Sequence, residues 1–370
     1  MLQRFLPILL ASSLLAGGPP TTPPEASAPV PSPLSAQIDG LLGRRYEADQ
    51  PGAVVLVVKE GKVIHRKAYG LASLELNVPM RPDQVFRIGS ITKQVTAAAV
   101  LKLAEEGKLD LKAPASRYLE ELPKVWDVVT VEQLLNHTAG IPSHKDHPTY
   151  KARMREDMTP AELLEAFVAN LPLEFEPGTR YRYSDTGYIL LGMLLERVSG
   201  QAYGELVQKR FFDPLGLKHM QYGSETELIE GLVPGYTKGP KPCAYRSTTQ
   251  AFASGGLVSD ADDVDRWLLA LYEGKVLKPE SLARMMTPLK LKDGKEVGYG
   301  FGIGFRPLGK ARLAGHAGGV PGFKSWAETD PATRTVVVIL NNTDAPKGDD
   351  MAYAKCIFAL LAGLPYQEPQ

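Results

Sequence analysis

The sequence predicts an α+β fold in which one mostly antiparallel sheet is built from both chain ends, with a mainly helical insertion beside it. Apolar strand-like runs occur in residues 53–69 and again after residue 299, whereas helical patterns fill the residues between. Strands and helices do not alternate as they do in a doubly wound parallel sheet, and no G-x-S-x-G turn is present. The predicted domain covers residues 35–365, with an α/β part at 35–85 and 250–365 and a helical part at 86–249.

The N-terminal residues predict export. Arg4 is followed by an apolar run over residues 5–16, which is too short to span a bilayer. Residues 1–18 are therefore interpreted as a signal peptide, and the Pro-rich residues 19–34 as an extended, disordered linker. Because no cysteine follows the apolar run, we expect no stable membrane anchor after cleavage, and a periplasmic or extracellular protein.

The composition argues against several function classes. Lys and Arg number 42, as do Asp and Glu, so net charge gives no case for a nucleic-acid partner. His144 and His147 form the only close histidine pair, in a charged segment that we expect to be solvated surface. The glycines of residues 300–304 are not followed by a helix, which argues against a nucleotide site. We therefore expect no metal and no cofactor. Whether Cys243 and Cys356 form a disulfide stays open.

The elements of the α/β part are predicted from hydrophobic patterning. At the N-terminal end these are a helix over 36–46 and strands over 53–58 and 62–69, which the turn at Glu60-Gly61 joins. At the C-terminal end they are helices over 260–272 and 281–286, strands over 299–306, 311–316, 323–328 and 335–340, and a final helix over 351–361.

The insertion is recognised by helix start and stop signals. Capping boxes at Thr130-x-x-Gln133 and Thr159-x-x-Glu162 begin two helices. The polar segment 142–158 between them is interpreted as a lid or surface excursion. Further helices are predicted over 188–198 and 203–212, and the long segment 221–249 is interpreted as a wall of the substrate cleft.

Ser90 and Lys93 form the candidate reactive pair. Ser90 begins a helix whose residues 94–104 are almost all apolar, and Lys93 lies one turn further on the same face. Burial disfavours the ammonium form of lysine and so favours the neutral amine that can take a proton from serine. The Ser90 N–H lies in the first helical turn and can face a developing oxyanion. An S-x-x-K pair alone is equally consistent with a helix-capping serine and a lysine that reaches solvent.

Two further motifs follow this pair, Tyr183-Ser-Asp185 and His316-Ala-Gly318. In this order the three motifs resemble those of the serine β-lactamase and penicillin-binding-protein superfamily, most closely the class C β-lactamase-like hydrolases, which include esterases and D-stereospecific peptidases. The resemblance runs from about residue 35 to 361 and includes the flanking stretches 86–93, 134–141, 183–192 and 315–323. It implies a three-layer α/β/α fold of the β-lactamase/transpeptidase type.

The resemblance assigns catalytic roles. Ser90 is the acylated nucleophile, Lys93 its proton partner, and Tyr183 a second general base or proton shuttle. The oxyanion hole is formed by the N–H groups of Ser90 and Gly319. Taken alone, Tyr183 is better explained as a core tyrosine with a satisfied hydroxyl.

The resemblance also places Asp185, His316 and Gly318 in the substrate site, and two of these depart from the common pattern. Asp185 replaces the asparagine of many members, and its carboxylate is expected to hold Lys93 protonated, leaving Tyr183 as the stronger base. Asp185 can also cap the helix that follows it, and His316 can be structural. His316 replaces a lysine common in β-lactamases, so the fixed positive charge that attracts a β-lactam carboxylate is lost.

These observations predict an exported serine hydrolase that cleaves a neutral ester or an amine-bearing amide through a Ser90 acyl-enzyme. The expected partner is a small-molecule or peptide substrate, such as an ester, a D-amino-acid amide, a β-lactam or a peptidoglycan fragment, with anionic β-lactams the poorest. Two alternatives stay open: a D,D-peptidase or true β-lactamase, and a catalytically inactive homologue that binds peptidoglycan or another ligand.

Overall fold

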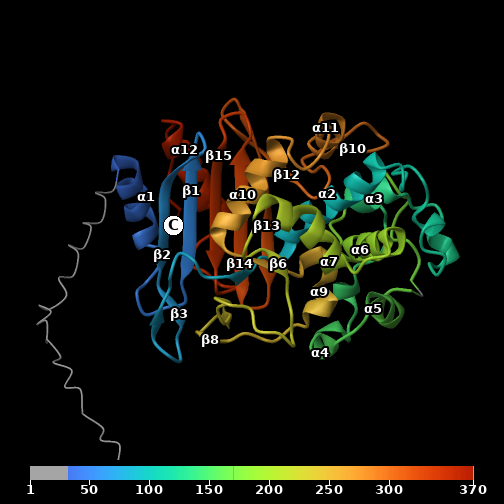
Figure 1. The fold of residues 1–370 in the computed structure, drawn as a ribbon, viewed down its shortest axis with the longest axis horizontal. Coiled ribbons are helices and arrows are strands. Elements are labelled where there is room, and N and C mark those ends of the chain that lie inside the picture. The colour runs from blue at the N-terminus through green and yellow to red at the C-terminus, as the bar shows by residue number, and fades with distance from the viewer. Residues whose placement is uncertain (1–31, 170, 370) are drawn as a thin grey trace, which may run out of the picture. The chain divides into compact units, whose positions relative to one another are not determined.

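A six-stranded antiparallel sheet organises the computed structural model, which describes residues 32–169 and 171–369. The strand order is β12-β13-β14-β15-β1-β2, so the N-terminal hairpin continues the C-terminal meander through the β1–β15 pairing (Figure 1). The strands are β1 (Ala53–Lys59), β2 (Lys62–Tyr69), β12 (Gly304–Leu308), β13 (Ala311–Val320), β14 (Phe323–Asp330) and β15 (Thr335–Asn341). The predicted sheet from both chain ends is confirmed.

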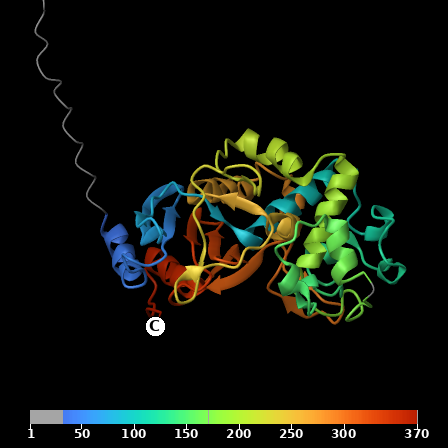
Figure 2. The same cartoon turned by 90° about the horizontal axis from the view of Figure 1, so that it is seen from below.

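Helices cover both faces of this sheet. Helices α1 (Pro33–Gly43) and α12 (Asp350–Leu361) pack on one face, where Val55 and Val57 of β1 join their core. Helix α10 (Ala261–Tyr272) packs on the other face, in the core that contains Val54 and Leu56. Successive β1 residues thus point to opposite buried faces, which explains the uninterrupted apolar run. The layers are visible in Figures 1 and 2, and the three-layer α/β/α prediction is confirmed.

The insertion is mainly helical, and Figure 2 shows these helices gathered beside the sheet. Its helices are α2 (Thr92–Glu105), α3 (Val131–Leu135), α4 (Tyr150–Arg153), α5 (Pro160–Phe167), α6 (Asp185–Ser199), α7 (Tyr203–Val207), α8 (Asp213–Leu215) and α9 (Thr248–Gly255). Helix α2 packs against α6 and α9, and its residues 92–101 are all buried, as the absence of a polar face predicted. Both capping boxes form as predicted, at Thr130 and at Thr159.

Short elements complete the chain. Helix α11 (Pro279–Met285) precedes β12, and small pairings involve β3 (Leu71–Ser73), β4 (Val78–Pro79), β5 (Phe86–Arg87), β6 (Gln221–Tyr222), β7 (Tyr236–Thr237), β8 (Lys241–Pro242), β9 (Leu257–Ser259), β10 (Leu289–Lys290) and β11 (Glu296–Val297). Within residues 32–169 and 171–369, no helix is both long and apolar enough to cross a bilayer. Cys243 and Cys356 are both free thiols.

Several boundaries differ from the predictions. Ser32 caps α1, so this helix includes the last residues of the predicted linker, whereas the predicted signal peptide and the remaining linker lie outside the described residues. The predicted helix over 203–212 divides into α7 and a π-helical turn, Gln208–Phe212. Strand β12 begins at Gly304 rather than residue 299, because Gly302 adopts a positive φ and turns the chain.

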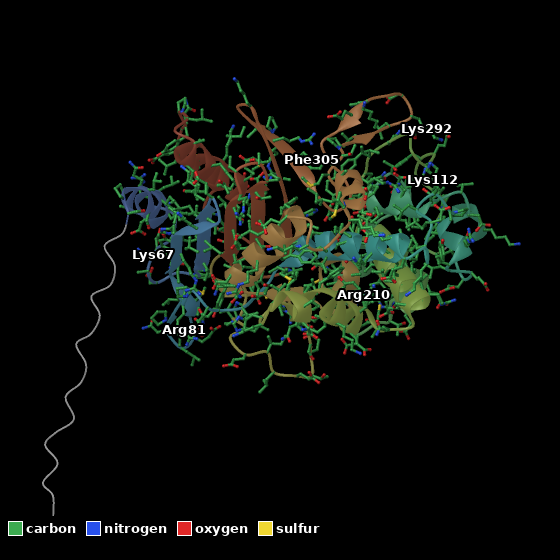
Figure 3. The ribbon with its side chains drawn as sticks, turned by 45° about the horizontal axis from the view of Figure 1, so that its top comes forward. Lys67, Arg81, Lys112, Arg210, Lys292 and Phe305 are labelled. Carbon is green, nitrogen blue, oxygen red and sulfur yellow. The ribbon has the colours of Figure 1, made fainter. Side chains whose placement is uncertain are left out.

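Exposed charges are dispersed in ion pairs over the surface. Four of the side chains labelled in Figure 3 each pair with a carboxylate from a nearby segment: Lys67 with Asp39, Arg81 with Asp83, Arg210 with Glu106 and Lys292 with Glu176. Such solvent-exposed pairs contribute little stability each. The buried ion pairs are therefore the ones expected to affect stability or function.

Candidate active site

The structure brings the three motifs together at the junction of sheet and insertion. Ser90 lies in a 3-10 turn, Gly89–Ile91, that leads into α2 and contacts β13 and β14. Gly89 has φ +52°, and a Cβ there would lie 2.6 Å from the Gly319 nitrogen. A Cβ on Gly318 would overlap the Ile88 carbonyl oxygen, whereas one on Gly319 would meet open space. Glycine at 89 and 318 is thus required by the close approach of two backbones, which sets β13 beside Ser90.

Lys93 makes three polar contacts that account for all of its ammonium protons. Its side chain is 0 % exposed, and Nζ lies 3.1 Å from Ser90 Oγ, 2.5 Å from Asp185 Oδ1 and 2.7 Å from the Ser254 carbonyl oxygen. A neutral amine keeps two of these bonds and directs its lone pair at the Ser90 hydroxyl. The same geometry therefore serves both protonation states, and a proton can pass between Ser90 and Lys93 without rearrangement.

Burial and the neighbouring charges place the pKa of Lys93 close to neutral pH. Burial lowers the pKa of Lys93 to about 8, although the Asp185 carboxylate acts in the opposite direction. Burial alone would raise the pKa of Asp185, but Lys93, Lys145 and Arg246 hold it well below its ordinary value. Asp185 is therefore ionised, and it lies in the first turn of α6 rather than capping the helix.

Tyr183 lies beside Lys93, and its hydroxyl stays protonated. Its ring lies 4.8 Å from Lys93 Nζ, and the Ser90 side chain is close enough to act against the rise in the pKa of Tyr183. The residue as a whole is 38 % exposed, yet burial of the hydroxyl raises the pKa of Tyr183 well above its ordinary value, and Asp185 raises it further. Asp185 thus disfavours the phenolate of Tyr183 as well as the neutral amine of Lys93, and the preference for Tyr183 as the base stays a prediction.

His316 belongs to a chain of four hydrogen bonds. His316 Nδ1 lies 2.5 Å from the Ala317 carbonyl, Tyr299 Oη lies 2.9 Å from His316 Nε2 and 3.2 Å from His137 Nε2, and the Ser184 nitrogen lies 3.3 Å from His137 Nδ1. A carbonyl only accepts, so His316 donates from Nδ1 and accepts from the Tyr299 hydroxyl. Tyr299 in turn accepts from His137, which accepts from the Ser184 N–H.

Burial favours the neutral form of both imidazoles in this chain. Burial lowers the pKa of His316 to about 4, with Lys93 lowering it further, and burial also lowers the pKa of His137 well below its ordinary value. The prediction of a neutral His316 agrees with this. Sequence reasoning missed Tyr299 and His137: Tyr299 was assigned to a strand, and the flanking stretch 134–141 contained His137 without suggesting a role for it.

The expectation of a solvated His144–His147 pair is wrong for His144. Its side chain is fully buried against α6, where its backbone nitrogen donates to Thr186 Oγ1 at 2.9 Å. Burial also lowers the pKa of His144 to about 3. His147 is half-buried and bonds with Thr149 Oγ1 instead. The predicted lid segment is thus anchored to the helix that carries Asp185.

One group of possible metal-ligating side chains, His219, Asp260 and Asp263, lies elsewhere in the described part of the chain. Asp260 caps α10 by accepting from the Asp263 nitrogen, and Asp263 accepts from the nitrogens of His219 and Met220. These bonds give the carboxylates a structural role in fixing the start of α10.

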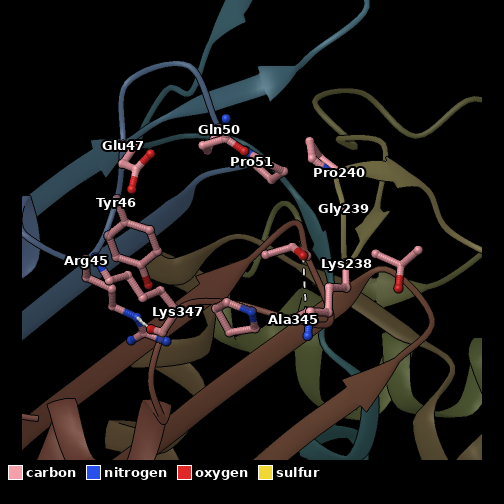
Figure 4. Close-up of a pocket in the computed structure, with 13 residues that line it drawn as sticks. Arg45, Tyr46, Glu47, Gln50, Pro51, Lys238, Gly239, Pro240, Ala345 and Lys347 are labelled. Carbon is pink, nitrogen blue, oxygen red and sulfur yellow. Dashed lines mark hydrogen bonds between the residues drawn. The ribbon is translucent and has the colours of Figure 1, made fainter. Parts of the chain in front are cut away.

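Two pockets help to delimit the site. One lies beside the motif segments and includes Gly255, next to Ser254, and Val320, next to Gly319; residues 243–246 of the predicted cleft wall contribute to its lining. A second pocket, lined by Arg45, Tyr46 and the β7–β8 turn, contains none of the motif residues (Figure 4). Ser90, Lys93 and Tyr183 line neither pocket, and the first pocket adjoins the segments that carry Ser254 and Gly319.

Fold and site together define a hydrolase of the serine β-lactamase and penicillin-binding-protein type. Residues 37–360 match the Beta-lactamase family, and the chain belongs to this family. It is 31 % identical over 359 residues to Esterase EstB of Burkholderia gladioli, covering 84 % of this chain and 91 % of the esterase. It is 26 % identical over 345 residues to a penicillin-binding protein of Bacillus subtilis (strain 168), covering 88 % of this chain and 75 % of that protein.

Solved structures agree with this assignment. A D-stereospecific amidohydrolase from Streptomyces sp. superposes with a TM-score of 0.76 at 28 % identity, covering 90 % of this chain and 99 % of that chain. D-amino acid amidase from Ochrobactrum anthropi SV3 complexed with D-phenylalanine gives 0.74 at 26 % identity, with coverages of 90 % and 99 %. The chain thus has esterase and amidase relatives within one serine hydrolase superfamily.

Proposed function

We propose that this protein is an exported serine hydrolase that cleaves an ester or an amide through an acyl-enzyme on Ser90. The observation that carries the proposal is the 3.1 Å contact between Ser90 Oγ and Nζ of a fully buried Lys93. Since burial lowers the pKa of Lys93 to about 8, an appreciable fraction of the enzyme carries the neutral amine near neutral pH. Export rests on the signal-like sequence of residues 1–18.

In acylation, Ser90 and Lys93 carry out bond formation and proton transfer, and the oxyanion hole binds the developing negative charge. Ser90 Oγ forms a bond with the substrate carbonyl carbon while Lys93 Nζ takes the serine proton. The backbone N–H groups of Ser90 and Gly319 receive the developing oxyanion. When the carbonyl re-forms, the bond to the leaving group breaks and that group needs a proton.

Tyr183 acts as a proton shuttle in this scheme. Its raised pKa keeps the hydroxyl protonated beside Ser90. It gives its proton to the leaving group and takes the proton held by Lys93. In deacylation water attacks the acyl carbon, its proton passes to the same pair, and Ser90 Oγ leaves protonated.

The preferred substrate is a neutral ester or an amine-bearing amide. His316 is neutral and uses both ring nitrogens in hydrogen bonds, so it offers no cation to a substrate carboxylate. An amide is supported by the amidase and amidohydrolase relatives, and an ester by the esterase relative. The penicillin-binding relative keeps D,D-peptidase or β-lactamase activity as the second candidate.

Stopped-flow release of p-nitrophenol from p-nitrophenyl butyrate tests the proposal. We expect a burst near one equivalent, or steady turnover if acylation is limiting, and either signal to be lost in Ser90→Ala. A D-amino-acid p-nitroanilide and a chromogenic cephalosporin, assayed in parallel, rank the substrate classes. Equal activity of both proteins, or no activity of either with a panel of acyl donors, would favour the alternative of an inactive ligand-binding homologue.

A further inference from the structure

We propose that Lys145 is a positioning residue for the Ser90–Lys93 pair: its ammonium binds one oxygen of Asp185, so that Asp185 orients Lys93 without retaining its proton. This inference rests on the proposed function of the same site. Nothing in the motif pattern singles out Lys145, which lies in the segment expected to be a lid or surface excursion.

The two oxygens of Asp185 bind different lysines. Oδ1 accepts from Lys93 at 2.5 Å, and Oδ2 forms an ion pair with Lys145. The Asp185 side chain is 5 % exposed, whereas that of Lys145 is 36 % exposed and reaches the carboxylate from the surface. Because the charge of Asp185 is shared by two cations, its net hold on the proton of Lys93 is weaker than that of an isolated carboxylate.

The backbone on both sides of Lys145 is fixed to the same part of the insertion. His144 bonds with Thr186 through its backbone nitrogen at 2.9 Å and through Nδ1 at 3.2 Å. Asp146 pairs with Arg182 at 2.7 Å. Lys145 is therefore held over the start of α6, and its ion pair with Asp185 follows from the local fold rather than from free movement of a long side chain.

Other polar groups around Lys93 do not substitute for Lys145. They are Ser90 and Tyr183, the Tyr188 ring at 5.3 Å, the neutral His137 and His316, and Arg246, which bonds with the Gln250 carbonyl. Arg246 also lowers the pKa of Lys93, but its effect is smaller than that of Lys145. Among these groups, Asp185 supplies the negative charge at Lys93 and Lys145 the larger share of the opposing positive charge.

Asp185 and Lys145 form a charge-compensated pair beside Lys93. Asp185 and Lys145 together carry no net charge, as a neutral amide does. The pair therefore keeps an acceptor for Lys93 while limiting the rise in the pKa of Lys93 that a lone carboxylate would cause.

The test is the pH dependence of kcat/KM for p-nitrophenyl butyrate in Lys145→Gln. Without the Lys145 charge, Asp185 holds the Lys93 proton more firmly, so the rising limb of the profile moves to higher pH. We expect a loss of about three- to tenfold at pH 7 that is recovered above pH 9, since each unit of pKa changes the neutral fraction about tenfold. Lys145→Arg keeps the wild-type profile because it keeps the charge.

Two further variants separate this role from a merely structural one. Lys151→Gln removes another exposed lysine of the same segment and serves as the matched control, with an unchanged profile expected. In an Asp185→Asn background, Lys145→Gln should produce a smaller shift than in the wild-type background, because only the direct repulsion between the ammonium groups of Lys145 and Lys93 remains once the carboxylate is removed.

Three results would overturn the inference: a Lys145→Gln profile that superposes on wild type, an equal loss in Lys145→Arg, or an undiminished shift in the Asp185→Asn background. Failure of the proposed function has a different signature, which is activity that survives in Ser90→Ala. If Ser90→Ala is inactive and Lys145→Gln is unchanged, only the role of Lys145 fails.

Discussion

Two carboxylates of this protein are buried against a cation with the same spacing, yet their surroundings suit them to different tasks. Asp350 lies 2.5 Å from Arg45, and Asp185 lies 2.5 Å from Lys93, with all four side chains at most 6 % exposed. Arg45 also donates to the Lys347 carbonyl, and Figure 4 shows Tyr46 and Lys347 beside it. Around Lys93 one neighbour is the hydroxyl of Ser90.

The reactive ion pair differs from the structural one in whether its cation can release a proton. Arginine does not release its proton in proteins, so Arg45–Asp350 can only tie the segment after α1 to α12. Lysine can release its proton, and burial has moved Lys93 to where that release is accessible. Both ion pairs are buried. Lys93, in contrast to Arg45, is a titratable cation beside a nucleophile.

Neutralising each cation in turn tests whether Lys93 serves catalysis and Arg45 serves stability. Lys93→Met should lower kcat/KM by about a thousandfold or more, because no group remains to accept the Ser90 proton. Its effect on stability should be small, since Lys145 still pairs with Asp185.

Arg45→Met should do the opposite. It leaves Asp350 buried without its cation, which costs about 3–5 kcal/mol of unfolding free energy, while the folded fraction keeps wild-type kcat/KM. Urea unfolding and ester hydrolysis, measured on both variants, check these opposite effects on stability and activity. Loss of activity in a folded Arg45→Met protein would contradict the separation of the two roles.

A second pair of variants examines how the backbone supports the reactive pair. Gly318→Ala should lower kcat/KM by about ten- to a hundredfold, because the added Cβ overlaps the Ile88 carbonyl and pushes β13 away from Ser90. Gly319→Ala, whose Cβ meets open space, is the matched control and should cost less than about threefold. Similar losses in both would show that the close approach at Gly318 is not what positions the site.

Much of the fold could be predicted because its signals are local. The apolar runs of β1 and β15 are continuous since both of their faces are buried, and the capping boxes at Thr130 and Thr159 mark helix starts within four residues. The glycine-rich end of β13 was missed, because residues 317–320 have little strand propensity and are held by pairing with β14.

The site was predictable only in part. Ser90 and Lys93 lie within one helical turn, so their contact follows from sequence spacing. The burial of His144, the bond between Tyr299 and His316 and the ion pair of Lys145 with Asp185 join segments distant in sequence. No local pattern carries such contacts, and the charge of Lys145 could not be weighed against that of Asp185 until the fold brought them together.

The pH dependence of Ser90 acylation tests most directly whether Lys93 accepts the serine proton. The rate is followed in single turnovers with p-nitrophenyl butyrate, and the acyl-enzyme is confirmed by its intact mass. We expect a rate that rises about tenfold per pH unit below pH 8 and levels off above it, as Lys93 loses its proton. The adduct should be absent from Ser90→Ala. A rate that is constant between pH 6 and 10, or an adduct that persists in Ser90→Ala, would contradict this expectation.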